Sequence, residues 1–196
     1  MGQKYSSDTL EFIAKEYVFL CSDTLKAHDM GDEDLIAFCH EKIDQFNSVI
    51  LKTEHYDELV EVLNAQKDDA TSIEPTVEFS EEQLDTALSF LRAGLVESRA
   101  SDLIDLSKQH QIATNAGNSE EVTTLETQLT DCCAWLNKEG TLMEVSQRID
   151  TLSDQTTQPE TAADFAPETA QAIAMAKNYV DTTKATLVAD ATAVQE

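Results

Sequence analysis

Glycine and proline are scarce in this 196-residue chain, which contains five glycines and three prolines. The glycine-rich loops that hold nucleotide phosphates, and the Gly-x-Ser-x-Gly turn of many hydrolases, need closely spaced glycines that are absent here. A β-rich fold would also place glycines at many turns. Instead, Gly31, Gly117 and Gly140 each follow a segment with helical periodicity, where glycine commonly ends a helix. This distribution favours an all-α protein without a nucleotide-binding loop.

Basic residues are also few, because 13 lysines and arginines stand against 38 aspartates and glutamates and the net charge is −25. A surface this negative repels nucleic-acid phosphates and anionic lipids, so direct nucleic-acid binding is not expected. The opening Met-Gly-Gln-Lys-Tyr-Ser fits the pattern for myristoylation of Gly2. A single acyl chain needs a second signal, such as a basic patch, and only Lys4 precedes the first helical segment. We therefore expect no lipid anchor at Gly2.

Long apolar runs are missing, which predicts that no segment spans a membrane. The four cysteines form no Cys-x-x-Cys pair, and a chain of this length does not need disulfides to fold. We therefore expect free thiols in a reducing compartment, either the cytoplasm or the interior of a virus particle.

Apolar residues recur at helical spacing along most of the chain. Three pairs have the spacing of capping boxes at helix starts: Asp8 with Glu11, Ser80 with Gln83, and Thr141 with Glu144. The pattern predicts helices at about 8–30, 32–50, 54–66, 81–115, 119–139 and 141–153. We expect an all-α bundle of five to six helices over residues 1–153, built round the long fourth helix and the hairpin that follows it.

The end of the chain has a different composition. Residues 154–167 are polar and contain prolines, which predicts a linker before an amphipathic helix at 168–196. The large apolar residues of this helix are spaced seven apart, at Ile173, Val180, Leu187 and Val194. Such a narrow stripe is typical of a helix that lies along its own bundle or of one that binds a partner. We take these four as candidate partner-binding residues, for another protein or a further copy of this chain.

No arrangement typical of catalysis or metal binding is evident. None of the four histidines follows a glutamate by three residues, which excludes the Glu-x-x-His pairs of di-iron bundles. Cys39, His40 and Glu41 are neighbours on a predicted helix, so they point in different directions and cannot share one ion. Cys39 and Cys132 fall on apolar stripes and are predicted to face inward, whereas His40 is predicted to be exposed. We expect a non-enzymatic protein with no catalytic residue, cofactor or metal.

Acidic residues are concentrated between residues 54 and 105, where 14 acids accompany three basic residues. Carboxylates on successive helical turns stand about 5–6 Å apart, which is close to the spacing of nucleic-acid phosphates. The candidate acidic face comprises Asp57, Glu58, Glu61, Glu81, Glu82, Asp85, Asp102 and Asp105.

Two functions are compatible with these features. The leading prediction is a non-catalytic protein that acts by protein–protein interaction, as an assembly, scaffold, adaptor or chaperone component, including one of viral or phage origin. The alternative is a nucleic-acid mimic whose acidic face inhibits a basic DNA- or RNA-binding enzyme or defence complex.

Overall fold

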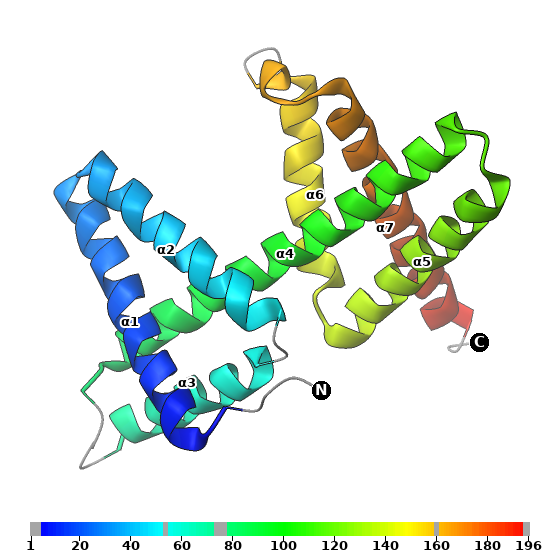
Figure 1. Ribbon diagram of the computed structural model, residues 1–196. Helices are drawn as coiled ribbons and strands as arrows, with labels where there is room; N and C mark the ends of the chain where they lie inside the picture. The colour runs from blue at the N-terminus through cyan, green and yellow to red at the C-terminus, as the bar shows by residue number, and fades with distance from the viewer. Residues whose placement is uncertain (1–4, 53–54, 73–77, 159–160, 194–196) are drawn as a thin grey trace. The chain divides into compact units, whose positions relative to one another are not determined.

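The computed structural model describes residues 5–52, 55–72, 78–158 and 161–193. Over these residues the chain forms seven α-helices and one short 3-10 helix, with no strand (Figure 1). The prediction of an all-α chain is therefore confirmed. Gly2 and Val194, which the sequence singled out, lie outside the described residues.

The chain divides into two compact units, residues 1–95 and 96–196. The division falls inside the long helix α4 (Glu81–Asn115), so each unit receives one part of that helix. This differs from the predicted arrangement of one bundle at 1–153, a linker at 154–167 and a separate tail helix. No break in the long helix marks the division, because the helix contains no proline and its single glycine does not interrupt it.

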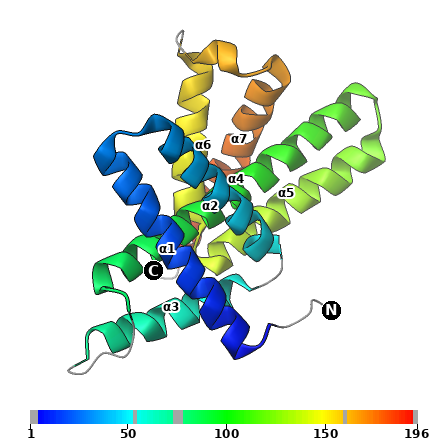
Figure 2. The same ribbon diagram turned by 60° about the vertical axis from the view of Figure 1, so that its left-hand side comes forward.

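In the unit 1–95, α1 packs against both α2 and α3, as Figure 2 shows from a second direction. Its helices are α1 (Ser7–Met30), α2 (Glu33–Lys52), α3 (Tyr56–Ala70) and the first part of α4. Tyr17, Leu59, Leu63, Leu84 and Leu91 are the largest fully buried side chains of its core. Burial of these apolar groups is the main stabilising contribution to the unit.

In the unit 96–196, α7 packs against α5 and α6, and the rest of α4 contributes to the same core. Its elements are α5 (Ser119–Glu139), α6 (Leu142–Thr157), the 3-10 helix η1 (Ala162–Asp164) and α7 (Pro167–Ala193). The predicted linker is thus shorter than expected, because α6 continues to Thr157 and η1 occupies part of the remainder. The tail helix is an integral part of this unit.

Several helix ends follow the predicted chemistry. Gly31, Gly117 and Gly140 all have positive φ, which glycine adopts without a steric penalty. At the start of α4, the Ser80 backbone N–H donates to Gln83 Oε1 at 3.0 Å, and the Gln83 N–H donates to Ser80 Oγ at 3.3 Å. This reciprocal pair is the predicted capping box.

Two other predicted caps are wrong in detail. Ser6, rather than Asp8, caps α1, because its hydroxyl accepts from the Thr9 N–H at 3.2 Å. Thr141 stands at the N-cap position of α6, but its hydroxyl donates to Glu139 Oε2 at 2.6 Å and makes no capping bond. The charged Glu139 carboxylate is a stronger acceptor than a neutral group. The Thr141 hydroxyl therefore bonds to Glu139 and does not accept from a backbone N–H of α6.

Candidate protein-binding site

Helix α7 is held in its unit by the first half of the predicted stripe. Ile173 and Val180 are each only 1% exposed and belong to the core formed with α4, α5 and α6. Ala172 and Ala176, both fully buried, allow α7 to approach that core closely. The structure therefore places Ile173 and Val180 in internal packing and not on a surface that a partner contacts.

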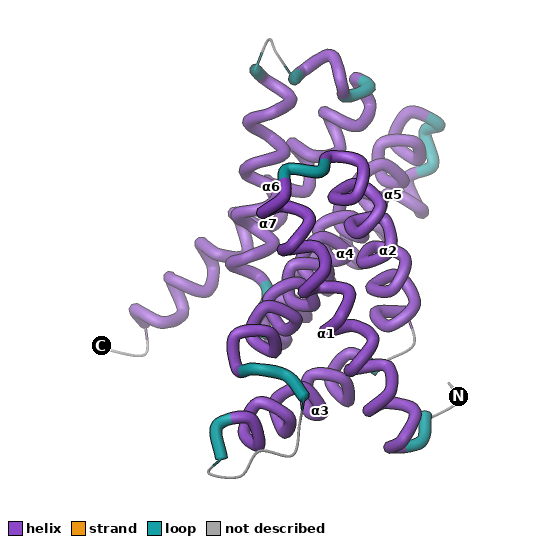
Figure 3. The backbone as a smooth tube through the Cα atoms, turned by 90° about the vertical axis from the view of Figure 1, so that its left-hand side faces the viewer, coloured by secondary structure: helices purple, strands orange, loops and turns teal. Residues whose placement is uncertain are grey.

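Leu187, the third residue of the stripe, is partly exposed to solvent. Leu187 is 36% exposed and the adjacent Val188 is 66% exposed. From residue 185 to residue 190 every side chain of α7 is exposed, and the end of the helix extends beyond α6 (Figure 3). An apolar pair on an otherwise exposed helical end is available for binding.

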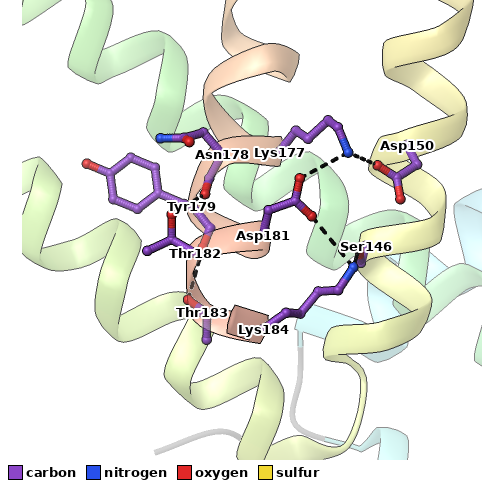
Figure 4. Close-up of polar contacts among 9 residues, drawn as sticks. All are labelled: Ser146, Asp150, Lys177, Asn178, Tyr179, Asp181, Thr182, Thr183 and Lys184. Atoms are coloured by element: carbon purple, nitrogen blue, oxygen red, sulfur yellow. Dashed lines mark hydrogen bonds and ion pairs between the residues drawn. The ribbon is translucent and has the colours of Figure 1, made fainter. Parts of the chain in front are cut away.

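Polar contacts fix how α7 is rotated on α6 (Figure 4). Lys177 forms ion pairs with Asp150 of α6 and, at 3.1 Å, with Asp181 on its own helix. The hydrogen bond to Asp150 raises the pKa of Lys177. Two turns later on α7, Lys184 Nζ donates to Ser146 Oγ at 2.9 Å. These contacts keep both lysines on the α6 side, so the opposite side of α7 faces away from α6.

That opposite side forms one wall of a groove of about 520 Å³ between α5 and α7. Figure 4 shows Asn178, Tyr179 and Thr182 on this side, turned away from Asp150. The lining residues are Thr130, Ala134 and Asn137 of α5 and Asn178, Tyr179, Thr182, Thr183, Thr186 and Leu187 of α7. None of them is charged, whereas 26% of all residues in the chain are. Three other grooves on the protein each include carboxylates.

The threonines make the groove less polar than their residue type suggests. Each of the four lining threonines donates its hydroxyl to the carbonyl four residues earlier on its own helix, at 2.8–3.0 Å. The hydroxyl hydrogen is therefore bonded within the helix and is not available to a ligand. Each threonine also has a methyl group. Together with Ala134, Tyr179 and Leu187, these methyl groups form a mainly apolar surface. The asparagine amides provide the remaining polar groups.

Acidic side chains stand just outside the two ends of this groove. Glu126 lies one helical turn before Thr130 on α5, with its Oε1 3.5 Å from His110 Nε2, and Asp190 lies one turn after Thr186 on α7. Both are exposed. A complementary ligand would therefore be uncharged along its middle and basic at its ends.

The residues of the predicted acidic face are divided between the two units. Asp102 and Asp105 belong to the unit 96–196, while the other six residues belong to the unit 1–95. Five of the eight carboxylates lie beside basic groups: Glu58 beside His55, Glu81 and Asp85 beside Lys67, Asp102 beside Arg99, and Asp105 beside Lys108. Glu81, Glu82 and Asp85 do line a common groove with Leu25 and Phe90. Most carboxylates of the predicted acidic face are therefore partly neutralised by their neighbours.

The four cysteines are free, and three of them are buried. Cys39 faces inward as predicted, but of the adjacent pair Cys133 is fully buried and Cys132 only half-buried. The prediction for this pair is wrong because the inward face of α5 runs through Leu125, Leu129, Cys133 and Leu136. His40, predicted to be exposed, is half-buried.

We expect Cys132 to react slowly with alkylating reagents in the native protein. Burial raises the pKa of its thiol to about 11, and since the thiolate is the nucleophile, iodoacetamide at pH 8 should modify it about 100-fold more slowly than an ordinary cysteine. The rate should rise with pH until about pH 11. Mass spectrometry of the labelled peptide measures this rate, and labelling in denaturant, where all four thiols should react alike, is the control. Rapid native labelling of Cys132 would contradict the burial of this side chain.

In the described part of the chain, no group of three or more His, Cys, Asp or Glu side chains is arranged to hold a metal ion. No helix within the same residues combines the length and apolar character needed to cross a membrane. No protein-family model matches the chain, and no curated protein or solved structure matches it significantly.

The groove between α5 and α7 was missed by the sequence reasoning, which followed large apolar residues only. A signal for it exists, because Asn178, Thr182 and Thr186 recur every four residues on α7, as do Thr130 and Ala134 on α5. Small and hydroxyl-bearing residues at this spacing mark one helix face as clearly as leucines do.

Proposed function

We propose that this chain is a non-catalytic interaction protein that binds a helical segment of another protein in the groove between α5 and α7. The uncharged lining of this groove is the observation that carries the proposal, because it stands out on a chain with a net charge of −25. Apolar grooves with a few amides at fixed positions are typical sites for amphipathic helices. Leu187 and Val188 extend the binding surface toward the end of α7.

The charge of the chain favours a different protein over a second copy as the partner. Two copies, each with a net charge of −25, repel each other over any shared surface. A partner segment with an uncharged face and basic ends would instead pair with Glu126 and Asp190 while its middle fills the groove. Such binding suits an assembly, scaffold, adaptor or chaperone component in a reducing compartment, where the four thiols remain free.

The acidic alternative has less support. A nucleic-acid mimic needs a continuous row of unneutralised carboxylates, whereas the predicted acidic face is divided between the two units and five of its members lie beside basic groups. The two functions also differ in how they respond to salt. Binding through carboxylates weakens steeply as salt rises, and binding in an uncharged groove does so much less.

The test uses a photo-crosslinking amino acid at Thr182 in the full chain, expressed in its source cells. We expect one major crosslinked partner, and the crosslinked peptide should have an uncharged, helix-forming middle and basic flanks. Adding Ala134→Arg should abolish the crosslink, because the arginine would project into the groove from an exposed position of α5. The matched control is Ala37→Arg, which adds the same charge at an exposed position of α2.

Three outcomes would contradict the proposal. The crosslink could survive Ala134→Arg, it could be lost equally in Ala37→Arg, or it could join only copies of this chain. A crosslink that disappears as salt is raised, and that neutralisation of Glu81, Glu82 and Asp85 removes, would support the acidic alternative instead.

A further inference from the structure

Two histidines from different helices meet in the unit 1–95. His28 lies in the last turn of α1 and His40 lies on α2, and their Nε2 atoms are 3.2 Å apart. The two helices pack side by side, as both Figure 1 and Figure 2 show. His28 is exposed and His40 half-buried, so the pair is accessible from solvent.

The separation of the two nitrogens suits two ligands of one metal ion. With metal–nitrogen distances of about 2.0–2.1 Å, two ligand nitrogens lie about 2.9 Å apart at a right angle and about 3.3–3.4 Å apart at the tetrahedral angle. The observed distance falls between these values. Without the ion one Nε2 donates to the other, so both imidazoles must carry their proton on Nδ1 before the two Nε2 lone pairs can bind a common ion.

The surroundings of the pair favour a cation. The C-terminal end of a helix carries a partial negative charge, and His28 stands in the last turn of α1. The chain as a whole is strongly negative, which raises the local concentration of cations.

We propose that His28 and His40 form a binding site for a divalent transition-metal ion, with water completing the coordination. Imidazole is a preferred ligand of Zn²⁺, Cu²⁺ and Ni²⁺, and not of Ca²⁺ or Mg²⁺, which prefer oxygen. The bound ion joins α1 to α2 across the turn at Gly31 and so stabilises this helical hairpin. This site is independent of the groove between α5 and α7 and does not rest on the proposed function.

The test titrates Ni²⁺ into the full chain by calorimetry, in a buffer with excess Mg²⁺ to occupy the carboxylates. We expect one equivalent to bind and the thermal unfolding midpoint to rise. His28→Gln and His40→Gln should each weaken binding by at least about tenfold, since loss of even an outer-shell partner of a metal ligand costs about 10–100-fold. Asp29→Asn and Glu41→Gln, which neutralise exposed neighbours of each histidine, are the matched controls and should change the affinity by less than about twofold.

Nuclear magnetic resonance of the imidazoles gives a second readout in the unmodified protein. The ring signals of His28 and His40 should change together with the first equivalent of Ni²⁺, while those of His55 and His110 should not. The proposal is overturned if both histidine variants retain full affinity, if the carboxylate variants lose as much as the histidine variants, or if the signals of other histidines respond first. In those cases the pair is an ordinary hydrogen bond between two imidazoles.

Discussion

Replacing Ile173 by aspartate is expected to unfold the unit 96–196, while the same replacement at Leu187 should leave that unit folded. Ile173 is 1% exposed within the core shared by α4, α5, α6 and α7. An aspartate there would bury a carboxylate among apolar side chains, away from water and from any cation, which is energetically costly. We expect the free energy of unfolding to fall by about 5 kcal/mol or more, which is comparable with the whole stability of a typical domain. Leu187 occupies the same register two heptads later but is 36% exposed, so we expect a loss of stability of about 1–2 kcal/mol, which leaves the unit folded.

The single tryptophan of the chain makes this comparison specific. Trp135 lies on α5, within the unit 96–196, and its ring stacks under the Arg99 guanidinium at 4.6 Å. Its fluorescence during denaturant unfolding therefore reports this unit and not the other. Ile173→Asp should show an unfolded signal without denaturant, and Leu187→Asp should retain a folded signal with a moderately lower midpoint. Equal behaviour of the two variants would show that the tail helix does not pack as described.

The same pair of variants separates stability from binding. Leu187→Asp keeps the fold but places a charge at the edge of the groove between α5 and α7. It should therefore weaken binding of the proposed partner. Deletion of residues 154–196 would not make this distinction. It would remove Ile173 and Val180 from the core and abolish the site and the fold together.

The helices of this protein could be predicted because their ends carry local chemistry. The Ser80–Gln83 capping box and the left-handed Gly31, Gly117 and Gly140 act within a few residues of themselves, so the sequence alone shows them. The choice between Ser6 and Asp8 as a cap was harder, since both can accept the same kind of backbone hydrogen bond.

Long-range features could not be predicted in the same way. The division of the chain inside α4 depends on which residues of that helix meet unit 1–95 and which meet unit 96–196, and both sets continue one apolar pattern. Whether each residue of the heptad stripe is buried also depends on the packing of distant helices. Buried Ile173 and exposed Leu187 share one heptad position, but only Ile173 falls where α4, α5 and α6 meet α7.

The one glycine inside a helix, Gly94, is expected to be required for close packing in the unit 1–95. A Cβ at this position would lie 2.7 Å from Cγ of Asn47 and closer still to its Nδ2. Asn47 cannot turn aside freely, because its Oδ1 accepts a 3.0 Å hydrogen bond from the buried hydroxyl of Tyr17. Gly94→Ala should therefore destabilise the unit by about 1–3 kcal/mol, although alanine favours an isolated helix over glycine by about 1 kcal/mol.

A double-mutant cycle with Asn47→Ala tests this explanation through a change of sign. Asn47→Ala alone should cost about 1–3 kcal/mol, because it leaves the Tyr17 hydroxyl buried without its acceptor. In that background the obstacle to a Cβ at position 94 is gone, so Gly94→Ala should stabilise the protein by up to about 1 kcal/mol. The slowest-exchanging amides of α1 measure both effects by hydrogen exchange. If Gly94→Ala destabilises equally with and without the Asn47 side chain, the contact between α2 and α4 is not what requires glycine.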